Sequence, residues 1–289
     1  ASIKKKNPKI LVIGDIMLDS YVFGVVERIS PEAPVPIINY RSQKNTLGGC
    51  GNVAYNLKNL GANISILSTV GNDDEGEIIK SILEKLEIKI EGLYIQNQSS
   101  TTKKTRFISG NSQLFRLDND SNGPPNRKIT KKYIKDYIET FDSIIVSDYD
   151  KGFCSNELIE HLIKEAQKFQ IPVFVDPKGD SWKKYSNSFC ITPNTKELEL
   201  VLNTSLIKDS DFETAARFIC EKYKIKSCLI TRGADGMTYV DKNRVIHQSV
   251  SKKEVYDVSG AGDTVIASFA ASLSSDLSIG EASNLSSSL

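Results

Sequence analysis

The chain has 289 residues, of which 39% are hydrophobic and 25% charged, values typical of a globular protein with one large core. Its 37 basic and 36 acidic residues leave a net charge of +1, which gives no reason to expect nucleic acid or an anionic membrane as a partner. Its five cysteines include no C-x-x-C pair, which disfavours a disulfide framework or a zinc site. No apolar stretch is long enough to span a bilayer and no h-region follows the N-terminal lysines, so we expect a cytoplasmic protein.

Short apolar runs rich in Val and Ile alternate with helical patterns along much of the chain. The runs lie at residues 10–13, 64–70, 143–146, 173–175, 189–191 and 228–230. The helical patterns lie at residues 52–60, 75–86, 157–169 and 211–223. Runs of this length and composition are typical of buried parallel strands. Their alternation with helices predicts a parallel sheet that is covered by helices on both faces.

Two regions break this alternation. Residues 21–41 hold three prolines and strand-like stretches but no helical pattern. Residues 103–108 and 113–117 indicate two strands around a Ser-Gly-Asn turn. We expect these pieces to pair into a small sheet that projects from the main domain as a lid, with segments at about 16–41 and 101–118.

Polar residues follow five of the predicted strands. They lie at residues 15–19, 147–148, 176–179, 192–194 and 231–233. In a parallel sheet these points share one edge, the carboxyl ends of the strands, where such folds bind ligands. Each segment alone is explained by a turn, because turns use the same residue types. The five together favour a binding site.

The strongest local signal is residues 257–263, which read Asp-Val-Ser-Gly-Ala-Gly-Asp and precede an apolar helical face. Gly260, Ala261 and Gly262 therefore open a helix, whose unpaired N–H groups and positive dipole end form an anion site. Asp263 in the first turn can accept the proton of an attacking hydroxyl while those N–H groups hold a phosphoryl group. The alternative is a Gly-rich turn whose carboxylate only complements the dipole. The glycines and the Asp together favour the functional interpretation.

Residues 194–197 read Asn-Thr-Lys-Glu and precede a helical pattern. Asn followed three residues later by Glu is a capping box, which needs no function, and from the spacing alone we favour the cap. On this edge of the sheet Glu197 can also hold Mg²⁺ through water, because Mg²⁺ commonly keeps several waters.

Residues 48–52 read Gly-Gly-Cys-Gly-Asn and open the first helix. Gly49, Gly51 and Ala54 match the dinucleotide pattern G-x-G-x-x-A, with Asp73 about 20 residues further on. The match is weak because a polar segment precedes it instead of a buried strand, and these glycines can equally let a sugar lie against the backbone. A P-loop is absent, since Gly-Lys-Ser/Thr occurs nowhere in the sequence.

Basic residues are frequent on the expected lid strands. Alternation along a strand places Lys104 and Arg106 on the same face. A solvated face is the default interpretation, but an anionic substrate beneath a lid would also use them.

Together these residues resemble the ribokinase (PfkB) carbohydrate kinases. Residues 257–263 resemble the D-T-x-G-A-G-D signature of that family. Its other motifs are matched in the right order at residues 48–52, 194–197 and 231–233. Val258 stands where many members have Thr, so that hydroxyl is missing here.

Within the family the chain is most similar to the D-glycero-β-D-manno-heptose 7-phosphate kinases, often the N-terminal half of a bifunctional ADP-heptose synthase. Residues 28–36, which read Arg-Ile-Ser-Pro-Glu-Ala-Pro-Val-Pro, are the most specific matching stretch. Val at position 258 is usual in this subfamily. The other matching stretches are residues 14–19, 113–118, 176–179 and 255–260.

The resemblance implies a ribokinase-like three-layer α/β/α sandwich with a mainly parallel central sheet and a small β-sheet lid, often used for homodimer contacts. It implies phosphorylation of heptose 7-phosphate at the C1 hydroxyl by ATP with Mg²⁺, while a K⁺ requirement stays open. The product would be heptose 1,7-bisphosphate, a precursor of lipopolysaccharide core heptose. The alternatives are another sugar-phosphate kinase such as a phosphofructokinase, a non-catalytic sugar-phosphate sensor, and a dinucleotide oxidoreductase.

The resemblance also implies roles for individual residues. Asp263 would be the general base, and Gly260, Ala261 and Gly262 would form the anion hole. The expected nucleotide residues are Asn194, Thr195, Lys196, Glu197, Thr231, Gly233 and Gly236, with Glu197 also serving the metal. The expected sugar residues are Asp15, Asp19, Gly48, Gly49 and Asn52. Charge and position add Lys104, Arg106 and Lys178 as candidates for the phosphate of the sugar.

We expect one kinase domain over residues 1–289. Family members usually continue past the Gly-Ala-Gly-Asp helix with another helix that closes the adenine side, whereas this chain ends at Leu289 after a Ser-rich stretch. We therefore expect the C-terminal part of the domain to be absent. A nucleotidyltransferase domain would carry an H-x-G-H motif, which the sequence does not contain, so we expect that domain to be absent as well.

Overall fold

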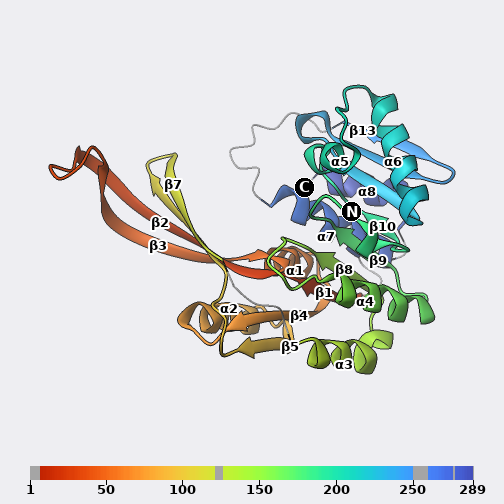
Figure 1. Ribbon diagram of the computed structural model, residues 1–289, viewed down its shortest axis with the longest axis horizontal. Helices are drawn as coiled ribbons and strands as arrows, with labels where there is room; N and C mark the ends of the chain where they lie inside the picture. Colours follow the sequence, from red (N-terminus) through yellow and green to blue (C-terminus); the bar gives the residue numbers. More distant parts are fainter. Residues whose placement is uncertain (1–6, 121–125, 250–259, 276, 289) are drawn as a thin grey trace.

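The computed structural model describes residues 7–120, 126–249, 260–275 and 277–288, and these residues form two sheets of different size (Figure 1). The larger sheet has the strand order β13-β12-β11-β10-β9-β8-β1-β4-β5. Its pairs β11–β12 and β12–β13 are antiparallel, and the other pairs are parallel. Its strands are β1 (Lys9–Gly14), β4 (Asn63–Gly71), β5 (Lys89–Gln96), β8 (Ser143–Ser147), β9 (Val173–Asp176), β10 (Cys190–Ile191), β11 (Ser227–Thr231), β12 (Met237–Asp241) and β13 (Val245–Gln248).

Helices cover both faces of this sheet, which confirms the predicted three layers. In β1, Leu11 and Ile13 belong to one hydrophobic cluster while Ile10 and Val12 belong to the other, because successive side chains of a strand point to opposite faces. The first cluster includes residues of α3 (Arg127–Tyr137), α4 (Asn156–Lys168), α5 (Thr195–Leu202) and α6 (Asp209–Tyr223). The second includes residues of α1 (Cys50–Asn59), α2 (Asp74–Lys85), α7 (Ala261–Ser274) and α8 (Ile279–Ser288). None of the described helices is both long and apolar enough to cross a membrane.

The end of the described chain is helical. Residues 283–288, the Ser-rich stretch, belong to α8, whose Ala282 is fully buried in the second cluster. A further helix therefore follows the Gly-Ala-Gly-Asp helix, whereas the Ser-rich stretch was expected to end the chain without one.

The smaller sheet is the lid, with the strand order β3-β2-β6-β7. Its strands are β2 (Ile16–Ile29), β3 (Pro36–Gly49), β6 (Lys103–Ser109) and β7 (Ser112–Asn119). The hairpin of β2 and β3 extends far from the central sheet (Figure 1). β3 continues to Gly49, beyond the expected limit at residue 41. Gly48 and Gly49 therefore end this strand directly before the start of α1.

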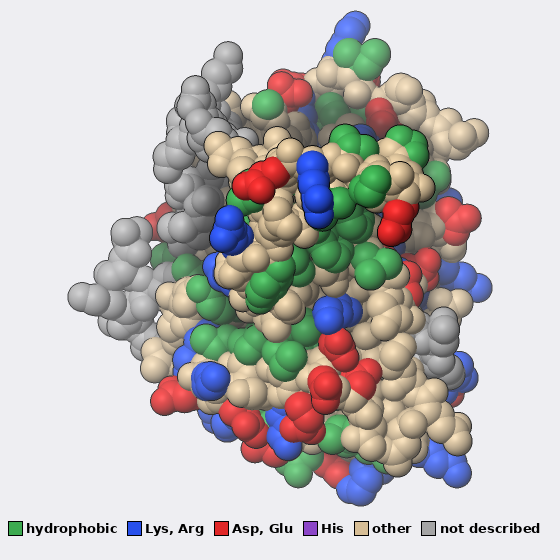
Figure 2. Space-filling view, turned by 90° about the vertical axis from the view of Figure 1, so that its left-hand side faces the viewer, with side chains coloured by type: hydrophobic (Ala, Val, Ile, Leu, Met, Phe, Trp, Pro, Cys, Tyr) green, Lys and Arg blue, Asp and Glu red, His purple; other side chains and the backbone are tan. Residues whose placement is uncertain are grey.

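The lid sheet has one charged and one apolar face. Register places Asp19 beside Lys104, with Arg106 two residues further along the same face. Phe115 and Leu117 lie on the opposite face and are 50% and 59% exposed. Figure 2 views the molecule from the side on which the lid projects, and hydrophobic side chains gather near the centre of this side of the molecule.

Candidate active site

The carboxyl ends of the parallel strands bring the predicted polar segments to one edge of the sheet. Register aligns Gly14 with Ser147, and Ser147 with Asp176. Further along, Asn194 forms a parallel bridge with Thr231. The segments that follow β1, β8, β9, β10 and β11 therefore lie in one row, as the sequence predicts.

Asp263 lies buried in the first turn of α7, with 4% of its surface exposed. Asn52 Nδ2 donates a hydrogen bond to Asp263 Oδ2 at 2.8 Å, and the Tyr149 hydroxyl donates to Oδ1 at 3.0 Å. Burial raises the pKa of Asp263 to about 6, and the two hydrogen bonds oppose part of this rise. A carboxylate with this pKa is well matched to act as a general base near neutral pH.

The start of α7 offers uncrowded backbone beside this carboxylate. Gly260 has φ 82°, and a Cβ there would lie 2.7 Å from Asn52 Nδ2, so a side chain would displace the amide that holds Asp263. Gly262 is exposed, and a Cβ on it would meet nothing within 4 Å. No described side chain caps this helix end. These features suit an anion site; residues 257–259 of the motif lie outside the described residues.

Part of the predicted sugar set gathers around Asp263. Asp19 Oδ1 accepts a hydrogen bond from Arg106 Nη1 at 2.6 Å. A Cβ on Gly48 would lie 2.4 Å from Asp19 Oδ2, so only glycine leaves room for that carboxylate. Burial lowers the pKa of the Lys104 ammonium, and the charges of Asp19 and Lys104 both act on Asp263. The charged face of the lid therefore lies over the candidate base.

Asp15 has a different position. It is 4% exposed, and its carboxylate accepts hydrogen bonds from the backbone N–H groups of Tyr149 at 2.9 Å, Lys151 at 3.2 Å and Phe153 at 2.9 Å. Burial raises the pKa of this carboxyl. Gly49, with φ 58°, would place a Cβ 2.2 Å from the Asp15 carbonyl oxygen. Asp15 therefore anchors the loop after β8.

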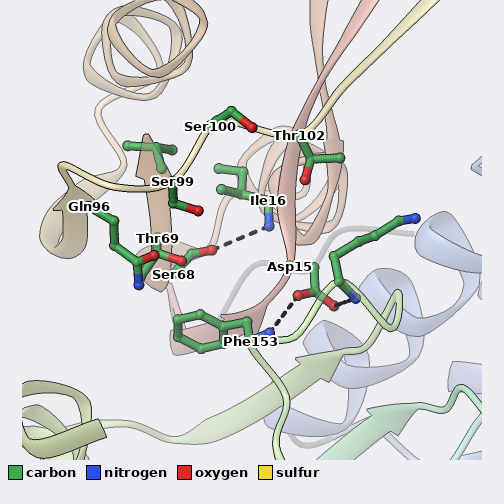
Figure 3. Close-up of a pocket in the computed structure, with 11 residues that line it drawn as sticks. Asp15, Ile16, Ser68, Thr69, Gln96, Ser99, Ser100, Thr102 and Phe153 are labelled. Carbon is green, nitrogen blue, oxygen red and sulfur yellow. Dashed lines mark hydrogen bonds between the residues drawn. The ribbon is translucent and has the colours of Figure 1, made fainter. Parts of the chain in front are cut away.

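A polar pocket opens beside Asp15 (Figure 3). In this view the hydroxyls of Ser99 and Thr102 point into the same space. Ser68 Oγ donates to the Gly14 carbonyl at 2.6 Å and accepts from the Ile16 N–H at 3.3 Å. Sequence reasoning missed these residues because single Ser and Thr residues carry no recognisable motif. The pocket is lined by Asp15, Ile16, Ser68, Thr69, Val70, Gln96, Ser99, Ser100, Thr102, Lys151 and Phe153.

The predicted capping box at the start of α5 is confirmed. Asn194 Oδ1 accepts from the Glu197 N–H at 3.0 Å, and Glu197 Oε2 accepts from the Asn194 N–H at 3.0 Å. The other oxygen, Glu197 Oε1, forms an ion pair with Lys178 Nζ at 3.0 Å. Lys178, expected at the phosphate of the sugar, therefore lies beside the predicted nucleotide motif.

Asp176, at the end of β9, was not among the predicted site residues. Burial, followed by the charges of Asp263 and Glu197, raises its pKa well above the usual range. A divalent cation would offset this crowding of carboxylates, so the donor set fits Mg²⁺ held by Glu197 through water. Mg²⁺ there would neutralise negative charge on the transferred phosphate.

The remaining predicted nucleotide residues lie on the neighbouring strand end. Thr195 Oγ1 donates to the Thr231 carbonyl at 3.4 Å, while Lys196 and Gly233 are exposed. Gly236 has φ 88°, and a Cβ there would lie 1.9 Å from the carbonyl oxygen of Gln248, so the hairpin that follows β11 requires glycine at this position.

Asp73, which the dinucleotide pattern would assign to a ribose, has a structural role. Its side chain caps α2 by accepting from the Gly76 N–H at 2.9 Å, and it also accepts from the Thr101 N–H at 2.7 Å. Gly49 ends a lid strand and not a strand of the central sheet. This arrangement gives no support to a dinucleotide site.

A buried carboxylate beside a glycine-opened helix, under a charged lid, is an arrangement suited to the transfer of a phosphoryl group to a hydroxyl group. The family model of the pfkB family carbohydrate kinases matches residues 7–288. The chain belongs to this family and is an ATP-dependent carbohydrate kinase.

Known proteins share both the sequence and the fold. The bifunctional protein HldE of Aliarcobacter butzleri is 41% identical over 280 residues, which cover 96% of this chain and 59% of that protein. The chain thus spans about three fifths of the length of this relative. Arabidopsis thaliana ribokinase, complexed with ribose and ATP, superposes with a TM-score of 0.80 at 18% identity, covering 98% of this chain and 91% of that one. Escherichia coli phosphofructokinase-2 in complex with potassium superposes with a TM-score of 0.81 at 21% sequence identity, covering 96% of this chain and 90% of that one. The two structures confirm the predicted fold.

We expect turnover by this kinase to require the ionised form of Asp263. Because burial raises its pKa to about 6, the carboxylate is protonated at lower pH and cannot accept the proton of a hydroxyl. The value of kcat/KM should fall about tenfold per pH unit below about pH 6 and level off above it. Initial rates of ATP consumption from about pH 5 to about pH 8 check this, and a flat profile would contradict it.

Proposed function

We propose that this chain uses ATP to phosphorylate D-glycero-β-D-manno-heptose 7-phosphate at its C1 hydroxyl, giving heptose 1,7-bisphosphate in the cytoplasm for ADP-heptose and lipopolysaccharide core synthesis. The observation that carries the proposal is the buried Asp263 carboxylate, held by Asn52 and Tyr149 beside the exposed start of α7. Similarity to the bifunctional protein HldE over 96% of the chain supports the choice of sugar.

The proposed transfer uses groups that lie close together. Asp263 accepts the proton of the C1 hydroxyl, whose oxygen attacks the γ-phosphorus of ATP. The bond from this phosphorus to the β–γ bridging oxygen breaks, and ADP leaves. The N–H groups at the start of α7 stabilise the negative charge of the phosphoryl group while it moves. The charged face of the lid covers the sugar and excludes water.

The three cations proposed for the sugar phosphate differ in their partners. Arg106 pairs with Asp19, and Lys178 pairs with Glu197. Among the described residues no carboxylate forms an ion pair with Lys104, whose Nζ lies 5.6 Å from the centroid of the Tyr149 ring. Lys104 is therefore the strongest of the three candidates for binding the phosphate.

An ATP-consumption assay across phosphorylated sugars tests the proposed function. We expect kcat/KM for heptose 7-phosphate to exceed that for fructose phosphates by at least about tenfold. Preference for a fructose phosphate would favour the phosphofructokinase alternative, and binding without ATP consumption would favour a sensor. Repeating the assay with Na⁺ in place of K⁺ tests for a monovalent-cation requirement.

We also propose that the lid joins two copies of the chain into a homodimer. Phe115, Leu117 and Tyr40 of the lid are 50%, 59% and 64% exposed, and β3 and β7 are edge strands. Leu117→Glu should reduce the mass measured by light scattering to that of a single chain. The matched control is Ile207→Glu, since Ile207 is 80% exposed outside the lid and its substitution should leave the dimer intact. A wild-type mass of one chain would contradict this proposal.

A further inference from the structure

Tyr149 lies in the loop after β8, and the backbone of this loop is fixed by Asp15. The N–H groups of Tyr149, Lys151 and Phe153 all donate to the Asp15 carboxylate. Asp150, between the first two, has φ 56°, a left-handed conformation that lets alternate amides point the same way. An anchored backbone restricts where the Tyr149 ring can lie, so its contacts follow from the fold.

The hydroxyl of Tyr149 reaches Asp263, 114 residues further along the chain, and donates to Oδ1 at 3.0 Å. Burial, followed by the charge of Asp263, raises the pKa of Tyr149, so the phenol keeps its proton and remains a donor. Asn52 holds the other oxygen, Oδ2, at 2.8 Å. Each carboxylate oxygen therefore has one protein donor and retains a lone pair for a substrate hydroxyl.

We propose that Tyr149 is a positioning residue for phosphoryl transfer: its hydroxyl keeps Asp263 ionised and fixes the direction from which Oδ1 receives the acceptor proton. This inference rests on the proposed role of Asp263 as the general base. Tyr149 acts through Asp263 and does not itself exchange a proton with the substrate.

Groups from several elements face Asp263 and set its charge. Burial is the largest influence and raises the pKa of Asp263, whereas the hydrogen bonds lower it. Loss of the phenol would remove one donor to the charged form, so the pKa would rise above about 6. The facing groups are Asn52 of α1, the Tyr149 hydroxyl, Lys104 of β6, Asp19 of β2 and Asp176 of β9.

Tyr149→Phe removes the hydroxyl and keeps the ring. The acidic limb of the kcat/KM profile is expected to move up by about one pH unit, because a hydrogen bond to a charged group typically contributes that much. The value of kcat/KM near pH 6 should then fall about fivefold, with the loss approaching about tenfold at lower pH and shrinking at higher pH. An unchanged profile, or an even loss at every pH, would overturn the proposal.

Tyr185→Phe is the matched control. The Tyr185 hydroxyl donates to Asp148 Oδ2 at 2.7 Å, so it supports the same loop, yet it makes no described contact with Asp263. Tyr185 is fully buried, and its variant should lower the melting temperature without moving the acidic limb. An equal shift of the limb in both variants would mean general loosening of the loop and would refute the role of Tyr149.

An NMR titration of isotope-labelled Asp carboxyl carbons separates this inference from the proposed function, since it needs no sugar. The resonance missing in Asp263→Asn identifies the carboxyl. We expect its midpoint near pH 6 in the wild type and about one pH unit higher in Tyr149→Phe. A failure to phosphorylate heptose 7-phosphate would reject the substrate alone, whereas equal midpoints in the two proteins would reject the proposal for Tyr149.

Discussion

Asp263→Asn is expected to lower the turnover number by about 100-fold or more while ATP binding is retained. The amide is nearly the same size as the carboxylate but cannot accept the proton of the acceptor hydroxyl. Its oxygen can still accept a hydrogen bond from either Asn52 or Tyr149, so the local packing should persist. Initial rates of ATP consumption give the loss of turnover, and titration calorimetry gives the affinity for ATP.

Asp150→Asn provides the control for loss of a nearby negative charge. Asp150 is exposed, adjoins Tyr149, and makes no described contact with Asp263. Asn tolerates the left-handed φ of 56° at this position, so the loop should keep its shape. Turnover should stay within about twofold of the wild type. Near-normal turnover in Asp263→Asn would place the general base on another residue.

Most strands of the central sheet could be predicted because they are short apolar runs that the local pattern detects, but β5, β12 and β13 were not among the predicted runs. α3 could not be predicted, because only Thr130, Tyr133 and Ile134 are buried among its eleven residues, and so sparse a stripe gives a weak helical signal. β10 has only two residues, and its limits depend on pairing with β9 and β11. Neither feature is determined by local sequence alone.

The site divides in the same way. Asp263 and Gly260 were predicted because the residues for anion binding and for proton acceptance are close together in the sequence, at the start of one helix. Tyr149 was missed because its contact with Asp263 spans 114 residues, which no motif spacing encodes. Lys178 was assigned to the sugar phosphate from its charge and its position after a strand, whereas in the structure it pairs with Glu197, 19 residues away on α5.

Asp15 shows how a correctly noticed residue can have a role that sequence does not reveal. The resemblance to the kinase family implied a sugar contact for Asp15, and the structure shows three hydrogen bonds from a loop 134 to 138 residues further on. That loop carries Tyr149 to the candidate base. The Asp15 carboxylate, directly after β1, therefore affects the position of Asp263 indirectly, through a loop that lies near Asp15 only in the folded chain.

Asp15→Ala is accordingly expected to lower the free energy of unfolding by about 3 kcal/mol or more. Three N–H groups lose their acceptor, one of them buried and two partly buried. A buried N–H group left without a partner costs about 1–3 kcal/mol, and a partly buried one costs less. The midpoint of denaturant unfolding at constant slope measures the change. The matched control is Asp142→Ala, since Asp142 Oδ2 accepts from the Lys9 N–H at 2.8 Å in an exposed setting, where the cost should stay below about 1 kcal/mol.

The two roles of Asp15 predict different results in the same variant. An anchor for the loop predicts lost stability together with lower turnover, because Tyr149 loses its fixed position against Asp263. A sugar contact alone predicts a stable protein whose KM for the sugar rises. Wild-type stability with a raised KM would therefore refute the anchoring role and support the assignment made from sequence. Because the carboxylate is 4% exposed and already accepts three protein hydrogen bonds, the first result is the expected one.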